Sequence, residues 1–320
     1  MSDPVEERSF FPKLHRNVTP TTSGSKVVSY SSDLGKDTPI LTLIHGYPQS
    51  SFEWRYVAPA LLDKVSLFIP ELPGYGISTP VKETTRLNVG SALLEALQST
   101  FDASKDSPRK VILGGHDRGA RICHRLAVNR RDFPALNVIG TIMLDIVPTK
   151  VQWDKSSDPA IASSYFHWPL LANVQVATRI LKAYGGGQWV RDANSRIAGN
   201  ELGRQRIEAD GAVDVYAALF EKEETIVESC KDYADGSVAE CKLQAADQEA
   251  GRKVDVPALV IFSKANLGAR IDVEQEWRAW ITEGVDYTGI GVGNGYGHYL
   301  PEEAYEDVIE AITNFLNKHT

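Results

Sequence analysis

The stretch Gly115-His116-Asp117-Arg118-Gly119 carries the residue types best suited to chemistry in this chain. It follows a short apolar run and leads into a helix-compatible segment. Gly-x-Asp-x-Gly in a strand–turn–helix setting is the nucleophile-elbow pattern, with Asp where Ser is usual. A carboxylate is already anionic at neutral pH, so it can attack saturated carbon and leave an ester on the protein. We therefore take Asp117 as the candidate nucleophile, rather than a surface Asp in a turn or a helix N-cap.

A second candidate lies near the end of the chain. His298 follows Gly-Tyr-Gly and precedes Tyr299-Leu300-Pro301, on a predicted loop between a strand and a helix. An imidazole titrates near neutral pH, which suits a general base that activates water. The alternative is a loop histidine in solvent, but a nucleophile upstream in the proper chain order favours the base.

Alternating apolar runs and helical patterns indicate the elements that must position Asp117. The predicted strands are 26–30 at an edge, then 39–44, 65–70, 111–113 and 138–144, and the predicted helices are 88–101 and 120–130. The continuous apolar runs are typical of strands covered on both faces. Strands alternating with helices predict an α/β fold whose mostly parallel sheet is flanked by helices.

The strand pattern stops between about Pro148 and Lys253, where helical patterns and aromatic residues predominate. Strand character resumes at 258–262 and 285–291, and an amphipathic helix at 302–317 closes the chain. The predicted organisation is a core of residues 1–149 and 254–320, with a helical cap (lid) of residues 150–253 inserted into it.

Composition excludes several other classes of function. The net charge of −8 argues against nucleic acid and anionic membranes as partners. The first residues are polar and charged, unlike a signal peptide, and no apolar run approaches the ~20 residues of a membrane helix. The three cysteines have no metal-ligand spacing and are expected to be reduced thiols. We therefore expect a cytoplasmic protein without membrane contact.

The sequence resembles the α/β-hydrolase fold over nearly the whole chain. Within that fold it is most similar to the haloacetate (fluoroacetate) dehalogenases, with epoxide hydrolases as the next relatives. The residues that carry the resemblance are His45-Gly46-Tyr47-Pro48-Gln49, the elbow through Arg121, Leu144-Asp145-Ile146-Val147-Pro148-Thr149, His167-Trp168, Asp232-Tyr233 and Gly297-His298. The resemblance implies a small organic-acid substrate, no metal or organic cofactor, and a homodimer as one oligomeric state.

Two carboxylates compete for the role of orienting His298 and stabilising its cation. Asp145 directly follows a predicted buried strand, as in the dehalogenases. Many relatives place this acid after the next core strand, but here that stretch has no carboxylate until Asp272, which precedes a helix start. We therefore assign the role to Asp145 and expect Asp272 to be an N-cap.

The resemblance also implies how the substrate is held. The backbone N–H groups of Tyr47 and Arg118 would form an oxyanion hole for ester hydrolysis. Arg118 and Arg121, one helical turn apart, would bind the substrate carboxylate and offset its repulsion from Asp117. The alternative is that these are solvated or ion-paired helix arginines, which we expect for Arg125.

The leaving halide would be surrounded by N–H and O–H donors of His167, Trp168 and Tyr233, against the alternative of a plain aromatic lid core. Two departures from the family bear on the substrate. No aromatic residue around 195–199 matches a further pocket tryptophan, and Gln152 stands where an aromatic or apolar side chain is expected. Both predict a larger or more polar pocket, which makes longer 2-halo acids or another electrophile plausible substrates.

These residues favour a hydrolytic dehalogenase of 2-halo acids that works through an Asp117 ester. An epoxide hydrolase shares the same machinery and would use Tyr233 with a second lid tyrosine. That second position holds His167, with Tyr165 as the substitute, and this and the paired arginines disfavour an epoxide hydrolase. A non-catalytic ligand-binding member of the fold is the third hypothesis. Binding without product over hours would distinguish it. The physiological substrate, the preferred halogen and the stereochemistry stay open from sequence alone.

Overall fold

The computed structural model describes residues 5, 7 and 9–320, so the other residues of the predicted core, 1–4, 6 and 8, lie outside the described part. Its centre is an eight-stranded sheet with the order β1-β2-β4-β3-β5-β6-β7-β8. The strands are β1 (His15–Pro20), β2 (Lys26–Ser32), β3 (Ile40–Thr42), β4 (Ser66–Pro70), β5 (Arg109–His116), β6 (Leu136–Leu144), β7 (Ala258–Ser263) and β8 (Tyr287–Val292). In the sheet order, every neighbouring pair from β4 to β8 is parallel. The pairs β1–β2 and β2–β4 are antiparallel. The predicted mostly parallel sheet is confirmed.

The edge of the sheet differs from the prediction. The strand expected at the edge, β2, pairs on both sides, with β1 and with β4. The sequence of β1, His-Arg-Asn-Val-Thr-Pro, is mostly exposed and has no apolar run, so its strand character comes from pairing with β2. By contrast, every residue of β3, β4 and β7 is buried, as a strand covered on both faces requires.

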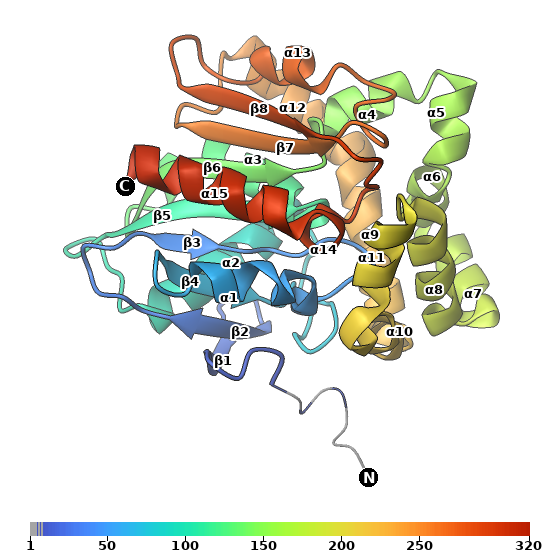
Figure 1. Cartoon of the computed structure of the whole chain (residues 1–320), viewed down its shortest axis with the longest axis horizontal. Coiled ribbons are helices and arrows are strands. Elements are labelled where there is room, and N and C mark those ends of the chain that lie inside the picture. The colour runs from blue at the N-terminus through green and yellow to red at the C-terminus, as the bar shows by residue number, and fades with distance from the viewer. Residues whose placement is uncertain (1–4, 6, 8) are drawn as a thin grey trace.

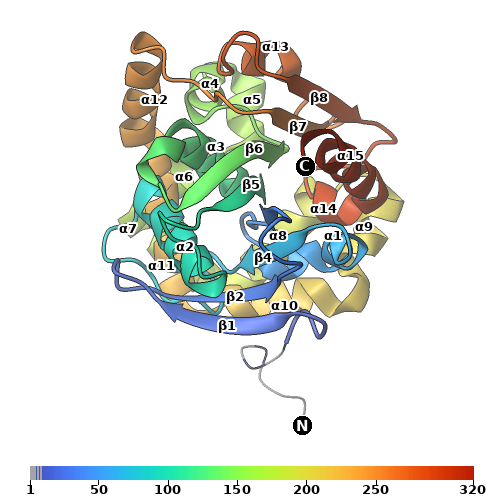
Figure 2. The same ribbon diagram turned by 90° about the vertical axis from the view of Figure 1, so that its left-hand side faces the viewer.

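Helices cover both faces of the sheet, with α2 and α3 on one face and α1 and α15 on the other (Figure 2). These core helices are α1 (Val57–Leu61), α2 (Arg86–Thr100), α3 (Arg118–Val128), α13 (Val273–Arg278), α14 (Leu300–Glu303) and α15 (Tyr305–His319). The predicted single helix at 302–317 is two helices, because the backbone leaves helical geometry at Ala304 (φ −127°, ψ 39°).

The chain between β6 and β7 is helical throughout its regular segments. It forms α4 (Thr149–Lys155), α5 (Pro159–Ser164), α6 (His167–Ala172), α7 (Val174–Tyr184), α8 (Gly186–Ile197), α9 (Glu201–Glu208), α10 (Ala212–Phe220), α11 (Glu223–Ala234) and α12 (Glu240–Glu249). Figure 1 shows α5 to α11 gathered beside one end of the sheet, next to the end of β7. We call α4 to α12 the cap helices. No helix of the described residues is long and apolar enough to cross a membrane.

Candidate active site

The turn between β5 and α3 holds Asp117 in a conformation that few L-residues adopt. Asp117 has φ 43° and ψ −112°, and its side chain is almost fully buried. The glycines on either side allow α3 to start close to the sheet. A Cβ on Gly115 would lie 2.7 Å from the Gly119 backbone, and one on Gly119 would lie 2.1 Å from the Ile44 carbonyl oxygen. Such a turn directs the side chain off the end of the strand.

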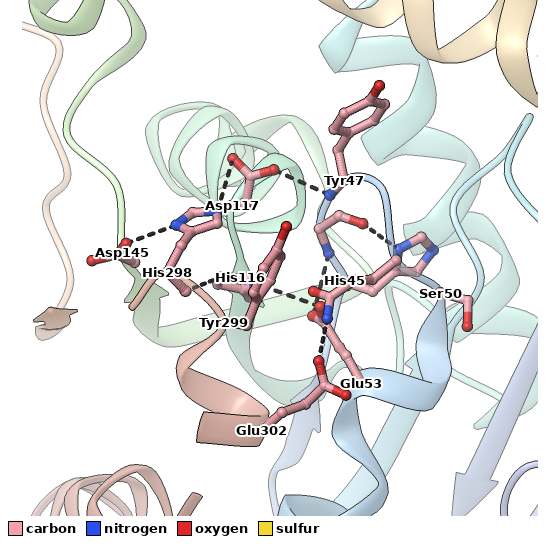
Figure 3. A network of polar contacts seen from close by, with 12 residues as sticks. His45, Tyr47, Ser50, Glu53, His116, Asp117, Asp145, His298, Tyr299 and Glu302 are labelled. Carbon is pink, nitrogen blue, oxygen red and sulfur yellow. Dashed lines mark hydrogen bonds and ion pairs between the residues drawn. The ribbon is translucent and has the colours of Figure 1, made fainter. Parts of the chain in front are cut away.

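Asp117, His298 and Asp145 form a connected group at the carboxyl ends of β5 and β6 (Figure 3). His298 Nε2 lies 4.0 Å from Asp117 Oδ1, and His298 Nδ1 lies 2.7 Å from Asp145 Oδ2. Asp145 is fixed in turn, because its Oδ1 accepts a 2.8 Å hydrogen bond from the Ser263 backbone N–H. The imidazole is therefore oriented by one carboxylate while its other nitrogen faces the second.

Asp272, the alternative carboxylate for orienting His298, has a different role in the structure. Asp272 is the N-cap of α13, and its side chain accepts a 3.1 Å hydrogen bond from the Gln275 backbone N–H. This is the position expected for it from the sequence, and it leaves Asp145 as the carboxylate that contacts His298.

Beneath this group lies a buried histidine that the sequence reasoning passed over. His116 Nδ1 is 3.1 Å from Glu53 Oε2, and His116 Nε2 is 2.9 Å from the backbone oxygen of His298 (Figure 3). Burial alone lowers the pKa of His116, but the Glu53 carboxylate outweighs burial and raises it to about 9. The protonated ring donates to both partners, so it ties the elbow to the loop that carries His298. His116 lies inside the elbow motif, and this position is the sequence feature from which a role at the site could have been predicted.

The backbone N–H of Tyr47 points at the Asp117 carboxylate and donates to Oδ2 at 3.1 Å. Arg118, the other residue expected to supply an N–H, directly follows Asp117 as the first residue of α3. The structure thus places both predicted oxyanion-hole residues beside the carboxylate that would become an ester.

A cavity of about 230 Å³ opens over Asp117. Its wall combines core residues, Asp117 and His298 among them, with residues of the cap helices such as Trp168 and Tyr233. Pockets for drug-sized ligands are roughly 300–1,000 Å³, so this volume suits a smaller substrate.

The three predicted halide-binding side chains meet in this cavity. The Tyr233 ring packs edge-on against both His167 and Trp168, with 5.8 Å between ring centroids in each pair. Among the described residues, the Trp168 indole N–H and the Tyr233 hydroxyl have no hydrogen-bond partner, and His167 Nδ1 is buried without one. Burial lowers the pKa of His167 to about 3, so the ring is neutral at physiological pH. Unpaired donors around a cavity are suited to an anion.

The two arginines predicted to bind the substrate carboxylate have side chains in different places. Arg121 lines the cavity, with its Nη1 donating to the Val147 carbonyl at 2.9 Å and its guanidinium carbon 4.5 Å from the Trp168 ring centroid. Arg118 does not line the cavity. Its Nε donates to Asp232 Oδ2 at 2.5 Å and its Nη2 to the Asp232 carbonyl at 2.8 Å. This differs from the placement expected for the Arg118 side chain, because Asp232 of α11 holds its Nε and Nη2, while its Nη1 is buried without a partner among the described residues.

Arg125 forms the buried ion pairs expected of a structural residue. Its two terminal nitrogens lie 2.8 Å from Glu240 and 2.6 Å from Asp247, both on α12. Arg118 and Arg125 together fasten α3 to the cap helices, and Arg121 between them keeps its guanidinium at the cavity.

Several cavity residues were not assigned from the sequence. Trp189 of α8 lines the cavity and donates from Nε1 to the Tyr47 hydroxyl at 2.6 Å, so an aromatic residue is present although none stands at 195–199. Gln152 lines the wall with a buried Nε2 that has no partner within the described part of the chain. Arg196 and Arg270 also line it. Helical spacing alone did not reveal which cap side chains turn inward.

The charges around Asp117 favour its ionised form. Burial alone would raise the pKa of Asp117, but His298, Arg121 and Arg118 outweigh burial and lower it to about 2. Asp117 is therefore an anion at any pH at which the protein is expected to work, as a nucleophile that attacks carbon directly requires.

Comparison with known proteins gives a consistent family. The profile described as the alpha/beta hydrolase family matches residues 43–311. The fluoroacetate dehalogenase of a Burkholderia species is 31% identical over 245 residues, covering 75% of this chain and 76% of that protein. The soluble epoxide hydrolase of Corynebacterium sp. (strain C12) is 25% identical over 279 residues, covering 86% and 89%. A Pseudomonas aeruginosa structure provisionally named as an epoxide hydrolase superposes with a TM-score of 0.83 at 25% identity, covering 98% of each chain.

Proposed function

Because the chain belongs to the α/β-hydrolase family, and is a hydrolase with dehalogenase and epoxide hydrolase relatives, we propose that it is a hydrolytic dehalogenase of 2-halo acids. The observation that carries the proposal is the buried, ionised Asp117 facing His298 in a cavity that also presents Arg121 and unpaired N–H and O–H donors. An anion next to a cation and a set of donors suits a substrate with a carboxylate beside a carbon–halogen bond.

In the first step, an Asp117 oxygen attacks the carbon that bears the halogen. The carbon–halogen bond breaks as the new carbon–oxygen bond forms, and the halide leaves with the bonding electrons. His167, Trp168 and Tyr233 donate to the departing halide, which matters most for fluoride because it is a poor leaving group. Arg121 holds the substrate carboxylate and offsets its repulsion from Asp117.

In the second step, water attacks the Asp117 carboxyl carbon. His298 accepts a proton from this water, and Asp145 stabilises the resulting imidazolium. The N–H groups of Tyr47 and Arg118 stabilise the oxyanion that forms on the ester. Collapse expels the alkoxide, which takes the proton from His298 and becomes the 2-hydroxy acid; the Asp117 carboxyl group that forms carries the remaining proton of the water and loses it to solvent, which restores the carboxylate.

An isotope experiment tests this route. With enzyme in excess over chloroacetate in heavy-oxygen water, the first turnover is expected to give glycolate whose new oxygen comes from Asp117 and carries no label. Label in that first product would exclude the ester.

A trapping experiment tests His298. The His298→Asn variant is expected to keep the first step and lose the second, so the enzyme gains the mass of a carboxymethyl group and retains it. His15→Asn, an exposed substitution in β1, is the control and is expected to turn over normally. Full turnover by His298→Asn would remove His298 from the mechanism.

An epoxide hydrolase is the second candidate, and one observation favours it. Tyr165 and Tyr233 both line the cavity, so two phenolic hydroxyls are available to protonate the oxygen of an opening epoxide ring. Arg121 would then have no anionic group to bind, which favours the halo acids. A panel of haloacetates, longer 2-halo acids and epoxides, read by halide release and diol formation, separates the two. Diol without halide release would establish the second candidate.

A further inference from the structure

Two cations at the mouth of the cavity have no role in the reaction described above. Arg196 stands at the end of α8, and Arg270 follows β7 in the core. Both side chains are exposed to solvent and both line the same cavity as Asp117. They come from opposite sides of the cap–core boundary, so the cavity mouth is positive on both sides.

The two guanidinium groups are positioned by neighbouring aromatic rings. Arg196 donates from Nη1 to the Ser164 carbonyl at 3.2 Å, and its guanidinium carbon lies 5.1 Å from the Phe166 ring centroid. Arg270 donates to the backbone oxygen and Oδ1 of Asn266 at 2.7 Å each, and its guanidinium carbon lies 5.8 Å from the Tyr165 ring centroid.

Tyr165 and Phe166, which carry these two rings, directly precede the candidate halide-binding residue His167 in the sequence. The Tyr165 and Phe166 rings each lie 6.2 Å from the His167 ring. The two guanidinium groups therefore flank one short segment at the cavity wall. The hydrogen bonds that these two arginines make to described residues all come from Nη1, which leaves Nε and Nη2 available to donate to a carboxylate.

Arg196 and Arg270 have no anionic partner among the described residues, whereas two other arginines of the cap helices do. Arg191 pairs with Asp214 at 2.7 Å, and Arg206 pairs with Glu306 at 2.7 Å. Arg196 and Arg270 form no ion pair with any carboxylate of the described residues. The chain as a whole carries a net charge of −8, so unpaired cations at this place are not part of a generally basic surface.

The carboxylates that line the cavity cannot serve as their partners. Asp145 is engaged by His298 and by the Ser263 backbone, and Asp117 must stay free to attack carbon. With Arg121 assigned to the carboxylate next to the reacting carbon, the two further cations remain available to another anionic group of the ligand. A fork of N–H donors matches a carboxylate in particular.

We propose that Arg196 and Arg270 form a second carboxylate subsite, so that the preferred substrate is a 2-halogenated dicarboxylic acid. This inference rests on the proposed function and specifies its substrate class. The carboxylate beside the halogen binds Arg121, the reacting carbon faces Asp117, and the distal carboxylate lies between the two rim arginines. Arg196 lies within residues 195–199, where no aromatic residue stands, so this part of the cavity mouth carries a positive charge.

A simpler role for rim cations is to attract every anion, which raises association rates for all carboxylates. The two roles predict different effects of substitutions on one ratio, that of kcat/KM for a dicarboxylate to kcat/KM for a monocarboxylate. Attraction by charge alone also favours a dicarboxylate over a monocarboxylate of equal length, but this preference persists when lysine replaces the arginine, because the charge is kept. With a subsite, lysine lowers that preference, because it lacks the fork of donors that matches the distal carboxylate.

The test compares matched pairs, 2-chlorobutanedioate with 2-chlorobutanoate and 2-chloropentanedioate with 2-chloropentanoate, as both enantiomers. Chloride release gives kcat/KM, and the ratio of dicarboxylate to monocarboxylate is the readout. The wild type is expected to favour a dicarboxylate, and the ratio is expected to fall roughly fivefold in Arg196→Gln and in Arg270→Gln. Lysine at either position keeps the charge without the fork and should give an intermediate ratio.

Arg179→Gln is the matched control. Arg179 is an exposed arginine of α7 that donates to the Gln175 carbonyl and lies outside the cavity wall, so the ratio should stay at the wild-type value. A wild-type ratio near one, an equal ratio in all variants, or lysine variants that keep the full wild-type ratio, would overturn the subsite and leave the dehalogenase proposal standing.

Binding of unreactive acids separates the two proposals. Calorimetry should show that pentanedioate binds the wild type more tightly than pentanoate, and that Arg196→Gln removes the difference. If no halo acid releases chloride but this difference is present, the proposed reaction fails and the subsite stands. If pentanedioate and pentanoate bind alike, the subsite fails.

Discussion

Replacing Asp117 with Asn separates what its charge does for catalysis from what it does for stability. Asn keeps the shape and one oxygen to accept the Tyr47 N–H, and Asn also tolerates positive φ. The variant loses the nucleophile, so halide release from chloroacetate should fall by roughly four orders of magnitude or more. The less obvious consequence is that the protein should also become less stable.

The size of the stability change follows from the pKa of Asp117. Burial raises that pKa, but electrostatic interactions with His298, Arg121 and Arg118 outweigh burial and lower it from 3.8 to about 2. A shift of about two units at about 1.4 kcal/mol each favours the ionised folded state by about 2 kcal/mol. Asn resembles the protonated acid, so the variant should lose about this free energy of unfolding at neutral pH.

The lowered pKa of Asp117 also determines how the stability difference between wild type and variant changes with pH. A carboxyl group whose pKa is lowered by folding contributes its stability above the unfolded pKa, and this contribution is lost as the pH falls through the folded value. The difference between wild type and Asp117→Asn should therefore be full above about pH 5 and shrink toward pH 2.

Urea unfolding at several pH values measures this difference, with Asp102→Asn as the control. Asp102 also has positive φ (49°) but is exposed in a turn, so its substitution should have little effect. Many buried active-site carboxylates destabilise their proteins. An Asp117→Asn variant as stable as the wild type at pH 7, or more stable, would show that burial outweighs the cations and would refute this account.

Three further substitutions test the surrounding structure. Trp168→Phe removes an indole N–H at the cavity and should lower fluoride release roughly tenfold more than bromide release; an equal loss for both halides would contradict the donor role. Gly119→Ala places a Cβ 2.1 Å from a backbone oxygen, so urea unfolding should show a loss above about 3 kcal/mol, and an unchanged midpoint would contradict the close approach. Arg125→Gln removes the buried cation from Glu240 and one of the two ion-pair partners of Asp247, which keeps Arg252, and should cost about 3 kcal/mol; a loss below about 1 kcal/mol would show that Arg252 and Gln244 compensate for the missing cation.

The central strands were predictable because burial on both faces leaves a plain mark in the sequence. The apolar runs at 111–113 and 138–144 lie within β5 and β6, and the apolar stripe at 302–317 lies mostly within α15. The edge strand β1 leaves no such mark, because pairing with β2 alone makes it a strand. The break at Ala304 was equally hidden, since an amphipathic pattern continues across it.

The same distinction applies to the site. Asp117, Asp145 and His298 each stand at the end of a strand or on a loop after one, so a correct sheet brings them together. Arg118 and Asp232 are 114 positions apart, and their ion pair depends on how α11 lies against α3. Contacts of that kind depend on the packing of the cap helices, which residue spacing does not encode.

The separation of Arg118 from Arg121 has a physical logic. Successive positions on one face of α3 carry cations, and a cavity that held both beside Asp117 would bind them to the nucleophile instead of the substrate. Asp232 neutralises Arg118 outside the cavity wall, while Arg121 rests on the Trp168 ring and on backbone oxygen, neither of which cancels its charge. One arginine thus fastens the cap and the next stays available to an anionic ligand, so the cap must be in place for the cavity to have its charge.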